Sequence, residues 1–255
     1  MQVSDTNFLG YPDCVKILKG LIFYFPYIRE RTSLPKRYWW ILATYILCQL
    51  SGLLSFTTLL NFLPAGQRIG ILTVTSFLIT LIIVLLLLWP EHRFVRDAER
   101  ADFGEAVKWA LIGIFLVYIT QIAAAIIEQA IFGTPVQSKN TEKIIRLSTI
   151  SPYVILVVVI VGPILEEIIF RKIIFGELYK KTNFWIAGII SSLLFALLHA
   201  DGHIILYGSI GLVLCYLYRK TKRIVVSMVA HGTMNTIAVL VAFQSFGFIS
   251  DFHTF

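Results

Sequence analysis

Two adjacent carboxylates mark the part of the sequence that is best placed to do chemistry. Glu166 and Glu167 follow an apolar run, 147–165, that contains no charged residue, and Arg171 comes shortly after them. An ionisable side chain inside hydrocarbon is costly, so it indicates a functional site or a buried ion pair. On a helix, Glu167 and Arg171 share a face, whereas Glu166 lies about 100° away. We therefore expect Arg171 to hold Glu167 and leave Glu166 free to face a cavity.

Three more polar residues lie in apolar segments late in the chain. His199 ends the segment 184–199, and His231 and Asn235 lie four residues apart in the segment 224–246, hence on one helix face. Either histidine alone is as well explained as a hydrogen-bonded packing residue. Polar groups in hydrocarbon seek one another because nothing else satisfies them, so we expect these residues and the glutamates to meet.

Together these residue types form a minimal set for hydrolysing a peptide bond without a covalent nucleophile. A carboxylate beside a histidine can deprotonate a water molecule, and a second histidine with an asparagine can donate hydrogen bonds to a developing oxyanion. Zinc is the competing interpretation, since two histidines and a glutamate can ligate it, although no His-Glu-x-x-His pair is present. No Gly-x-Ser-x-Gly motif supports a serine nucleophile, so Ser209 and Ser227 are interpreted as helix-packing residues.

The composition indicates the environment in which this chemistry would occur. Of the 255 residues, 57% are hydrophobic and only 15% are charged, against about 25% charged in soluble domains. The chain is therefore expected to be an all-α, polytopic membrane protein in contact with lipid, and its net charge of +7 to reflect topology rather than nucleic-acid binding. Cys14, Cys48 and Cys215 are widely spaced and odd in number, which favours small buried residues over disulfides or metal ligands.

Apolar segments predict about seven transmembrane helices after an interfacial helix near residues 17–25. The expected spans are 38–63, 69–89, 109–132, about 151–179, 184–199, 204–218 and 224–246. A charged loop or surface helix at 91–108 and a polar link at 136–146 would connect them. We accordingly divide the chain into an N-terminal cytoplasmic or interfacial segment, 1–37, N-terminal transmembrane helices, 38–135, and a catalytic transmembrane core, 147–250.

The positive charges predict the orientation of these spans. Segments 1–37, 90–108, 171–183 and 219–223 hold 18 of the 22 lysines and arginines. Because cytoplasmic loops carry an excess of Lys and Arg, the N-terminus is expected inside and the C-terminus outside. The chain is thus predicted to be an integral membrane protein, and its short length and compact N-terminal segment favour a bacterial cell membrane.

The depth of the polar residues can be predicted from helical rise. If the fourth span continues past Arg171 to Lys180, then Glu166, His199, His231 and Asn235 lie roughly 12 to 22 Å from the charged ends of their helices. All four then fall in the middle of a hydrocarbon core about 30 Å thick. Small residues that allow helices to approach are Gly188, Ser192, Gly208 and Gly211.

Other polar residues near the span ends are assigned no chemistry. Glu128, near the end of the third span, is expected to reach the headgroup region. His92, Asp201 and His203 lie in or beside loops and are expected to be solvated.

Three motifs carry a family resemblance over about residues 150–245. Glu166-Glu167-x-x-x-Arg171, Phe195-x-x-x-His199 and His231-x-x-x-Asn235 occur in that order. They resemble the motifs of the CPBP family, the CAAX proteases and bacteriocin-processing enzymes, also called Abi or Rce1-like intramembrane glutamic endopeptidases. The resemblance implies a helical membrane fold whose cavity opens toward the cytosol.

The same resemblance implies a role for each motif residue. Glu166 and His199 would activate the water, His231 and Asn235 would form the oxyanion hole, and three residues would support the site: Glu167, Arg171 and Phe195. No cofactor is implied. Substrates would be peptides or proteins, in peptide or bacteriocin maturation or in self-immunity.

Two non-enzymatic alternatives remain open at this point. A membrane immunity or scaffold protein could use the same polar residues only to hold helices together, although the presence of every motif residue favours catalysis. A proton-coupled carrier also uses buried Glu and His, but the sequence shows no repeat symmetry.

Overall fold

The computed structural model describes residues 34–51, 62–93, 100–134 and 139–245, all within the unit Leu34–Phe255. Regular structure in these ranges is entirely helical. The predicted interfacial helix near 17–25, Cys14 and the segment 52–61 of the first predicted span lie outside the described residues. The helices are α2 (Lys36–Ser51), α3 (Ala65–Leu88), α4 (Phe103–Phe132), α5 (Lys139–Ile150), the segments α6 (Val154–Leu156), α7 (Gly162–Glu166) and α8 (Gly176–Tyr179), α9 (Phe184–His199), α10 (Ile204–Thr221) and α11 (Ile224–Ser245).

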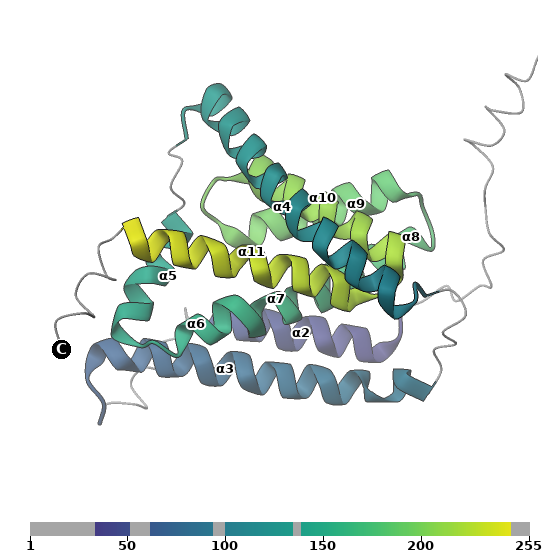
Figure 1. Ribbon diagram of the computed structural model, residues 1–255. Helices are drawn as coiled ribbons and strands as arrows, with labels where there is room; N and C mark the ends of the chain where they lie inside the picture. The colour runs from purple at the N-terminus through teal and green to yellow at the C-terminus, as the bar shows by residue number, and fades with distance from the viewer. Residues whose placement is uncertain (1–33, 52–61, 94–99, 135–138, 246–255) are drawn as a thin grey trace, which may run out of the picture. The chain divides into compact units, whose positions relative to one another are not determined.

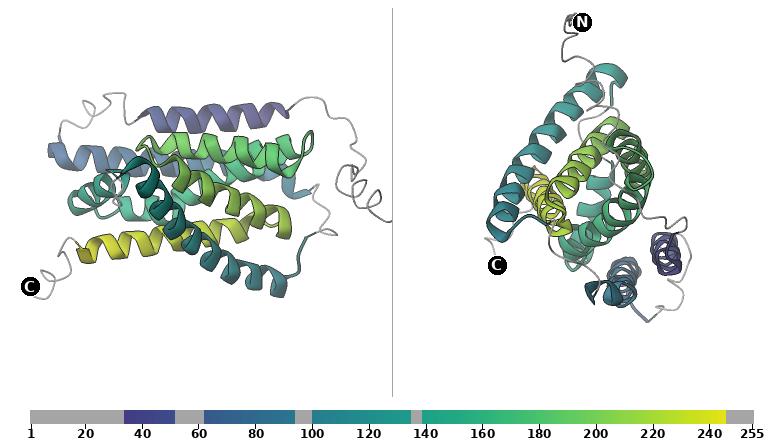
Figure 2. Two further views of the ribbon diagram at one scale, coloured as in Figure 1. Left: turned by 90° about the horizontal axis from the view of Figure 1, so that it is seen from above. Right: turned by 90° about the vertical axis from the view of Figure 1, so that its right-hand side faces the viewer.

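The helices lie side by side, with α4 inclined to most of the others (Figures 1 and 2). The closest packing joins α9 to α10, α10 and α11 to α4, and α2 to α3. Three helices are long and apolar enough to cross a membrane, at Gln67–Glu91, Phe103–Phe132 and Ile224–Gln244, and Phe184–His199 is a shorter apolar helix. The all-α polytopic membrane fold is thereby confirmed, while the number of seven spans remains a prediction.

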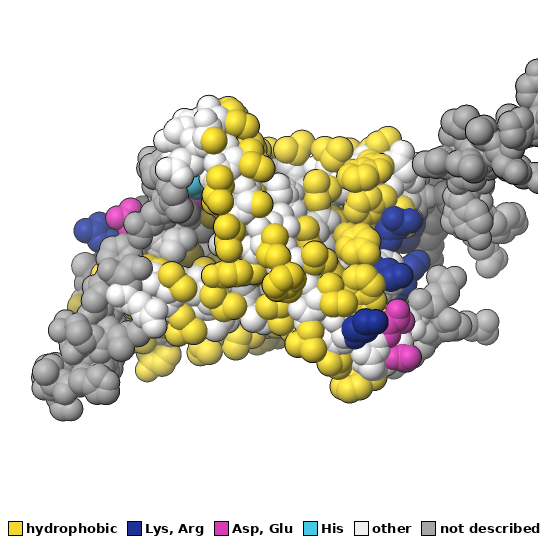
Figure 3. Space-filling view, turned by 45° about the horizontal axis from the view of Figure 1, so that its top comes forward, with side chains coloured by type: hydrophobic (Ala, Val, Ile, Leu, Met, Phe, Trp, Pro, Cys, Tyr) yellow, Lys and Arg dark blue, Asp and Glu magenta, His cyan; other side chains and the backbone are white. Residues whose placement is uncertain are grey.

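Charged and apolar side chains are segregated on the surface. In Figure 3 hydrophobic side chains cover the middle of the molecule, and the Lys and Arg side chains in view lie at its two ends, most of them at one. At that end Glu91 forms ion pairs with Arg37 at 3.2 Å and with Lys172 at 2.6 Å. These ion pairs connect the start of α2, the short 3-10 helix Trp89–Arg93 that follows α3, and the helix that carries the two glutamates.

Two connecting segments differ from the prediction. Asp102 caps α4 by accepting a 2.7 Å hydrogen bond from the Glu105 N–H, so the helix begins at Phe103, earlier than expected.

The predicted polar link is occupied by α5, whose residues Ile145 and Ser148 are buried. Its apolar residues recur at helical spacing beneath a polar exterior, so the segment forms an amphipathic helix rather than a loop.

The helix that carries the glutamates runs from Val154 to Tyr179 and alternates between α and π turns. Residues Val157–Val161 and Glu167–Phe175 are π-helical and flank α7. The predicted continuation past Arg171 is therefore present. Single π turns within α-helices occur often at functional sites.

Only some of the predicted small residues are needed for close helix packing. A Cβ on Gly211 of α10 would lie 2.8 Å from the Cβ of Ser192 in α9, so only glycine fits there. A Cβ on Gly188 would lie 3.1 Å from Leu212, whereas one on Gly208 would meet open space. The expectation for Gly208 is therefore wrong, because no neighbouring helix approaches it.

Candidate active site

A fully buried cluster of charges lies at the centre of the bundle. Arg171 approaches Oε1 of Glu167 to 3.0 Å, as their spacing on one helix predicts, and Nδ1 of His231 lies 2.9 Å from the same oxygen. Glu167 and Arg171 have no exposed surface, and His231 is 1% exposed. Because a carboxylate oxygen accepts, the Nδ1–H of His231 donates to Glu167.

Glu166 points differently from Glu167, as their adjacent positions on the helix require. Its carboxylate is partly exposed and borders a cavity of about 370 Å³. Its Oε2 lies 3.6 Å from Nε2 of His231, so the imidazole lies between the two glutamates, with its Nδ1 held by Glu167. The two adjacent carboxylates therefore have different environments. Glu167 is buried beside Arg171 and His231, and Glu166 faces the cavity.

His199 enters the same cavity from the last turn of α9. Its Nδ1 lies 2.9 Å from the carbonyl oxygen of Phe195, and its ring stacks on Tyr207 with centroids 3.8 Å apart and an interplanar angle of 22°. A carbonyl can only accept, so Nδ1 carries the proton and the neutral ring keeps a lone pair on Nε2. The stack and the hydrogen bond together fix the orientation of the ring.

Phe195 lies between the buried cluster and the cavity. Its ring packs edge-on against His199 and His231, with centroid distances of 4.7 and 5.6 Å. The guanidinium of Arg171 lies 4.3 Å from its centroid, a cation–π contact. Phe195 thus touches both histidines and the arginine, which fits its predicted supporting place.

Asn235 is held by an irregularity in the glutamate helix. Pro163 has no N–H to offer the carbonyl of Val158, five residues before it, which is the partner that π-helical spacing would select. The Nδ2 of Asn235 donates to that carbonyl at 3.0 Å. Beside it, a Cβ on Gly232 would lie 2.9 Å from the carbonyl of Val159, so glycine lets α11 come close enough for this bond.

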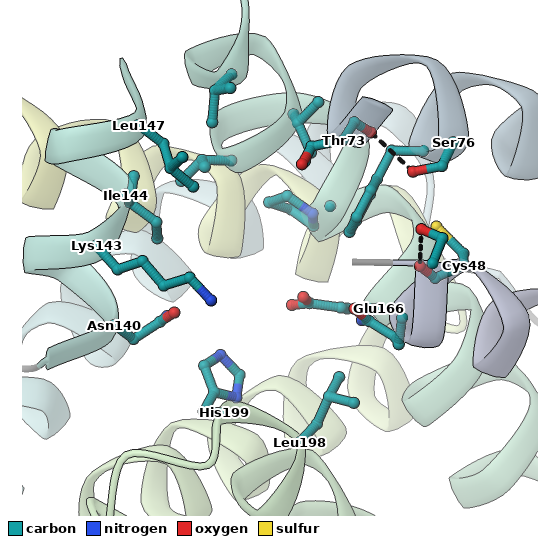
Figure 4. Close-up of a pocket in the computed structure, with 18 of the residues that line it drawn as sticks. Cys48, Thr73, Ser76, Asn140, Lys143, Ile144, Leu147, Glu166, Leu198 and His199 are labelled. Atoms are coloured by element: carbon teal, nitrogen blue, oxygen red, sulfur yellow. Dashed lines mark hydrogen bonds between the residues drawn. The ribbon is translucent and has the colours of Figure 1, made fainter. Parts of the chain in front are cut away.

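Figure 4 shows Glu166 and His199 on facing walls of the cavity. No hydrogen bond or ion pair joins these two side chains in the described part of the chain. A second cavity of about 620 Å³, mainly apolar, lies among α4, α5, α10 and α11. It shares five lining residues with the first cavity: Asn140, Ile144, Val158, His199 and Asn235. His199 and Asn235 therefore sit where the two cavities meet, and Glu166 borders the first of them.

Metal ligation was the competing interpretation of these residues. Within the ranges that the structure describes, no group of three or more His, Cys, Asp or Glu side chains is arranged to hold a metal ion. Cleavage measured with and without a strong chelator tests the zinc alternative.

A second buried acid–histidine pair was missed by the sequence analysis. Glu128 is 1% exposed, and its carboxylate lies 2.7 Å from Nδ1 of His203 and accepts the N–H of Ile205 at 2.8 Å. The Glu128 carboxylate is buried within the protein rather than directed to the surface, and His203, 6% exposed, is not solvated. Both predictions are wrong because α4 packs along α10 and brings the carboxylate to the loop between α9 and α10. The side chain of His92 lies outside the described residues.

The loop after His199 has a further polar contact. Asp201 accepts hydrogen bonds from the His203 N–H at 3.2 Å and from the Tyr207 hydroxyl at 3.0 Å. It is half-buried and hydrogen-bonded, so the expectation of a solvated side chain holds only in part. Because Tyr207 stacks on His199, the loop and the site residue are coupled through direct contacts.

These features define a polytopic helical membrane protein with a buried carboxylate–imidazole cluster opening on a cavity. Residues 148–237 match the family model described as "Type II CAAX prenyl endopeptidase Rce1-like". The chain belongs to the Rce1-like CAAX protease family, and it is a membrane-embedded protease and an integral membrane protein.

Curated relatives from bacteria cover much of the chain. It is 41% identical over 220 residues to a Bacillus subtilis protein named "Putative membrane peptidase YdiL", covering 82% of this chain and 90% of that protein. It is 41% identical over 141 residues to the "Membrane-embedded CAAX protease MroQ" of Staphylococcus aureus, covering 52% and 57%. It is 26% identical over 156 residues to the "UPF0177 protein YvdC" of Lactococcus lactis, covering 57% and 59%. No solved structure matches the chain.

Proposed function

We propose that this protein is an intramembrane endopeptidase in which Glu166 and His199 activate the attacking water. The observation that carries the proposal is their position on facing walls of one cavity with no bond between them. A water molecule between them could give a proton to the Glu166 carboxylate while it hydrogen-bonds to Nε2 of His199. The resulting hydroxide would attack the peptide carbonyl, and Glu166 would pass the proton to the leaving amine as the C–N bond breaks.

The oxyanion would be stabilised by His231 and Asn235. The amide of Asn235 has a second hydrogen after its bond to Val158. The Nδ1–H of His231 is already donated to Glu167, so His231 can donate through Nε2 only as an imidazolium. Once Glu166 has taken the proton of the water, Glu167, Arg171 and protonated His231 carry a net charge of +1 together, which the oxyanion balances. The Glu167 carboxylate would therefore stabilise the cation that the oxyanion requires.

The main competing function is a non-catalytic scaffold in which the same residues hold helices together. The contacts of Glu167, Arg171 and Asn235 suit that role, because they join α11 to the glutamate helix. Glu166 does not suit it. Its carboxylate borders the cavity, and its nearest ion-pair partner, His231, is already hydrogen-bonded elsewhere.

Proteolysis of a membrane-peptide library by purified protein separates these functions. We expect wild type to cleave with or without a strong chelator, and Glu166→Gln to remain folded and lose cleavage by at least a hundredfold. Glu142→Gln is the matched control, since Glu142 is exposed on α5 and does not line the cavity. Cleavage by Glu166→Gln at the wild-type rate would support the scaffold. Loss of cleavage on chelation would restore the zinc mechanism.

We further infer that the natural substrates are peptides or small proteins at the membrane, in peptide or bacteriocin maturation or self-immunity. The family resemblance supports this inference. Peptidomics of membranes from cells that carry wild type or Glu166→Gln tests it, because a substrate accumulates uncut only in the variant.

A further inference from the structure

A cation with no role in the proposed mechanism faces the catalytic cavity. Lys143 of α5 is the one lysine or arginine among the described residues that line the 370 Å³ cavity. Figure 4 shows its ammonium group extending into the cavity from the wall opposite Glu166, near His199 and Asn140. Its side chain is exposed, so a ligand in the cavity can reach it.

The position of Lys143 follows from the register of α5 rather than from one side-chain rotamer. Asn140, Lys143, Ile144 and Leu147 all line the cavity. Their spacing of three, four and seven residues places them on one face of the helix. The backbone of Lys143 therefore lies at the cavity wall whichever rotamer the side chain adopts.

Lys143 has no acidic partner in the described chain. The residues three and four positions away are Asn140, Lys139, Arg146 and Leu147, so its own helix face supplies no carboxylate. Glu142 is adjacent in sequence and thus points about 100° away. No hydrogen bond or ion pair joins Lys143 to Glu166 or to any other residue that the structure describes.

We propose that Lys143 binds a carboxylate of the peptide substrate while Glu166 and His199 act on the bond that is cleaved. This inference rests on the proposed function and adds a substrate class to it, namely peptides with an acidic group near the cleaved bond. A lysine is a compact cation with three donors, and its attraction for an anion grows in a cavity with low-dielectric walls.

The neighbouring cavity offers no charged partner for an acidic group, which favours binding of the substrate carboxylate at Lys143. The described residues that line the 620 Å³ cavity include no Lys, Arg, Asp or Glu, and most are apolar. An acidic group would lose hydration there without gaining a partner. A substrate that occupies both cavities therefore places its apolar part among α4, α10 and α11 and its carboxylate beside Lys143.

The carboxylate can belong to the C-terminus or to an Asp or Glu side chain, and paired peptides distinguish the two sources. Each apolar peptide is made as a C-terminal acid and as an amide, and each again with Asp or Asn at one internal position. We expect wild type to favour the acidic member of one pair by roughly tenfold or more in kcat/KM, chiefly through KM. The pair that shows this preference identifies the source.

Variants of α5 test whether Lys143 causes the preference. In Lys143→Met we expect the ratio of kcat/KM for the acidic peptide to that for its neutral partner to fall close to one. Arg146→Met is the matched control, because it removes the same charge from the same helix at a residue that does not line the cavity. The control should keep the wild-type ratio.

Binding to Glu166→Gln separates this inference from the proposed function. In lipid nanodiscs, acidic peptides should bind this variant more tightly than neutral ones, and adding Lys143→Met should remove the difference. Equal binding of the paired peptides, or a preference that persists without Lys143, overturns the inference and leaves water activation by Glu166 intact. Cleavage by Glu166→Gln overturns the proposed function, while the binding difference still reports on Lys143.

Discussion

At the scale of single residues, one oxygen of Glu167 organises the buried charges. It lies within hydrogen-bond distance of Arg171 and of His231, at 3.0 and 2.9 Å. Taking a lone charge out of water costs several kcal/mol, and this cost is offset only when each buried charge has a partner. Glu167 is therefore needed to keep both a guanidinium and an imidazole inside the bundle.

Removal of Glu167 should destabilise the fold and not only the activity. Glu167→Leu leaves Arg171 buried without a counter-ion, so we expect a loss of about 3–5 kcal/mol in the free energy of unfolding. Thermal or denaturant unfolding in detergent measures this loss. Replacing Glu167 and Arg171 together by leucine should restore part of it, because no unpaired charge then remains.

An exposed ion pair provides the comparison for that prediction. Glu177 and Lys180 form an ion pair three residues apart near the charged end, and the lysine is exposed. Glu177→Leu should change the free energy of unfolding by no more than about 1 kcal/mol. An equally small effect of Glu167→Leu would contradict the role given to the buried cluster.

Sequence alone could predict some residue contacts and not others. The pair Glu167 and Arg171 followed from their spacing on one helix, because helical neighbours are set by local geometry. The choice of His231 for Glu167, and of Glu128 for His203, depends on how helices distant in sequence align. Hydrophobic periodicity does not report this register, so both contacts were unpredictable.

At the scale of helices, Pro163 explains why the glutamate helix binds Asn235. A proline within a helix leaves a carbonyl of the preceding turn without its donor, and the Val158 carbonyl is bonded by the side-chain amide of Asn235 instead. The hydrogen bond from Asn235, which replaces the missing backbone bond, links the position of α11 to the helix segment just before Glu166. It also explains how an asparagine of α11 is held at the cavity wall.

Pro163→Ala should weaken this link. The new N–H can bond a carbonyl of the preceding turn and compete with Asn235, so we expect a lower kcat with little loss of stability. The measurement is a double-mutant cycle with Asn235→Ala. In the wild-type background this second change should cost about 1 kcal/mol of unfolding free energy, and clearly less in Pro163→Ala. Equal costs in the two backgrounds would show that the residues are independent.

The loop between α9 and α10 depends in the same way on a residue of α4. Glu128→Ala leaves the imidazole of His203 and the N–H of Ile205 without their acceptor, at a cost of about 1–3 kcal/mol for each buried group left unpaired. We expect a lower melting temperature together with a lower kcat, since this loop follows His199 directly. Glu142→Ala, at an exposed position of α5, should leave both quantities unchanged.

Element boundaries were easier to predict than element geometry. α9 spans the residues that the sequence predicted, because an asparagine cap and the loop at 200–203 bound its apolar run. The π turns of the glutamate helix could not be foreseen. In a segment that is apolar on all sides, the sequence pattern is the same for an α-helix with about 3.6 residues per turn and for a π-helix with more. Hydrophobic periodicity therefore does not indicate where α turns give way to π turns.

At the scale of the whole described unit, the lysine-rich end and the cavity lie at opposite ends. The cavity is lined by the last residues of α2 and α9, the first half of α3 and the helix α5. Lys180 and Lys181 precede the opposite end of α9. The positive-inside rule puts the lysine-rich end in the cytoplasm and so turns the cavity outward. A cavity open toward the cytosol, as the family resemblance implies, requires the reverse orientation.

Accessibility of single cysteines decides between the two orientations. In a background with Cys14, Cys48 and Cys215 changed to serine, Lys143→Cys reports on the cavity end and Lys181→Cys on the lysine-rich end. From the distribution of charge, we expect a membrane-impermeant maleimide to label Lys143→Cys in intact cells and Lys181→Cys only after permeabilisation. The opposite pattern would place both the N-terminal end of α2 and the lysine-rich loops outside. It would also mean that substrates reach Glu166 from the cytosol.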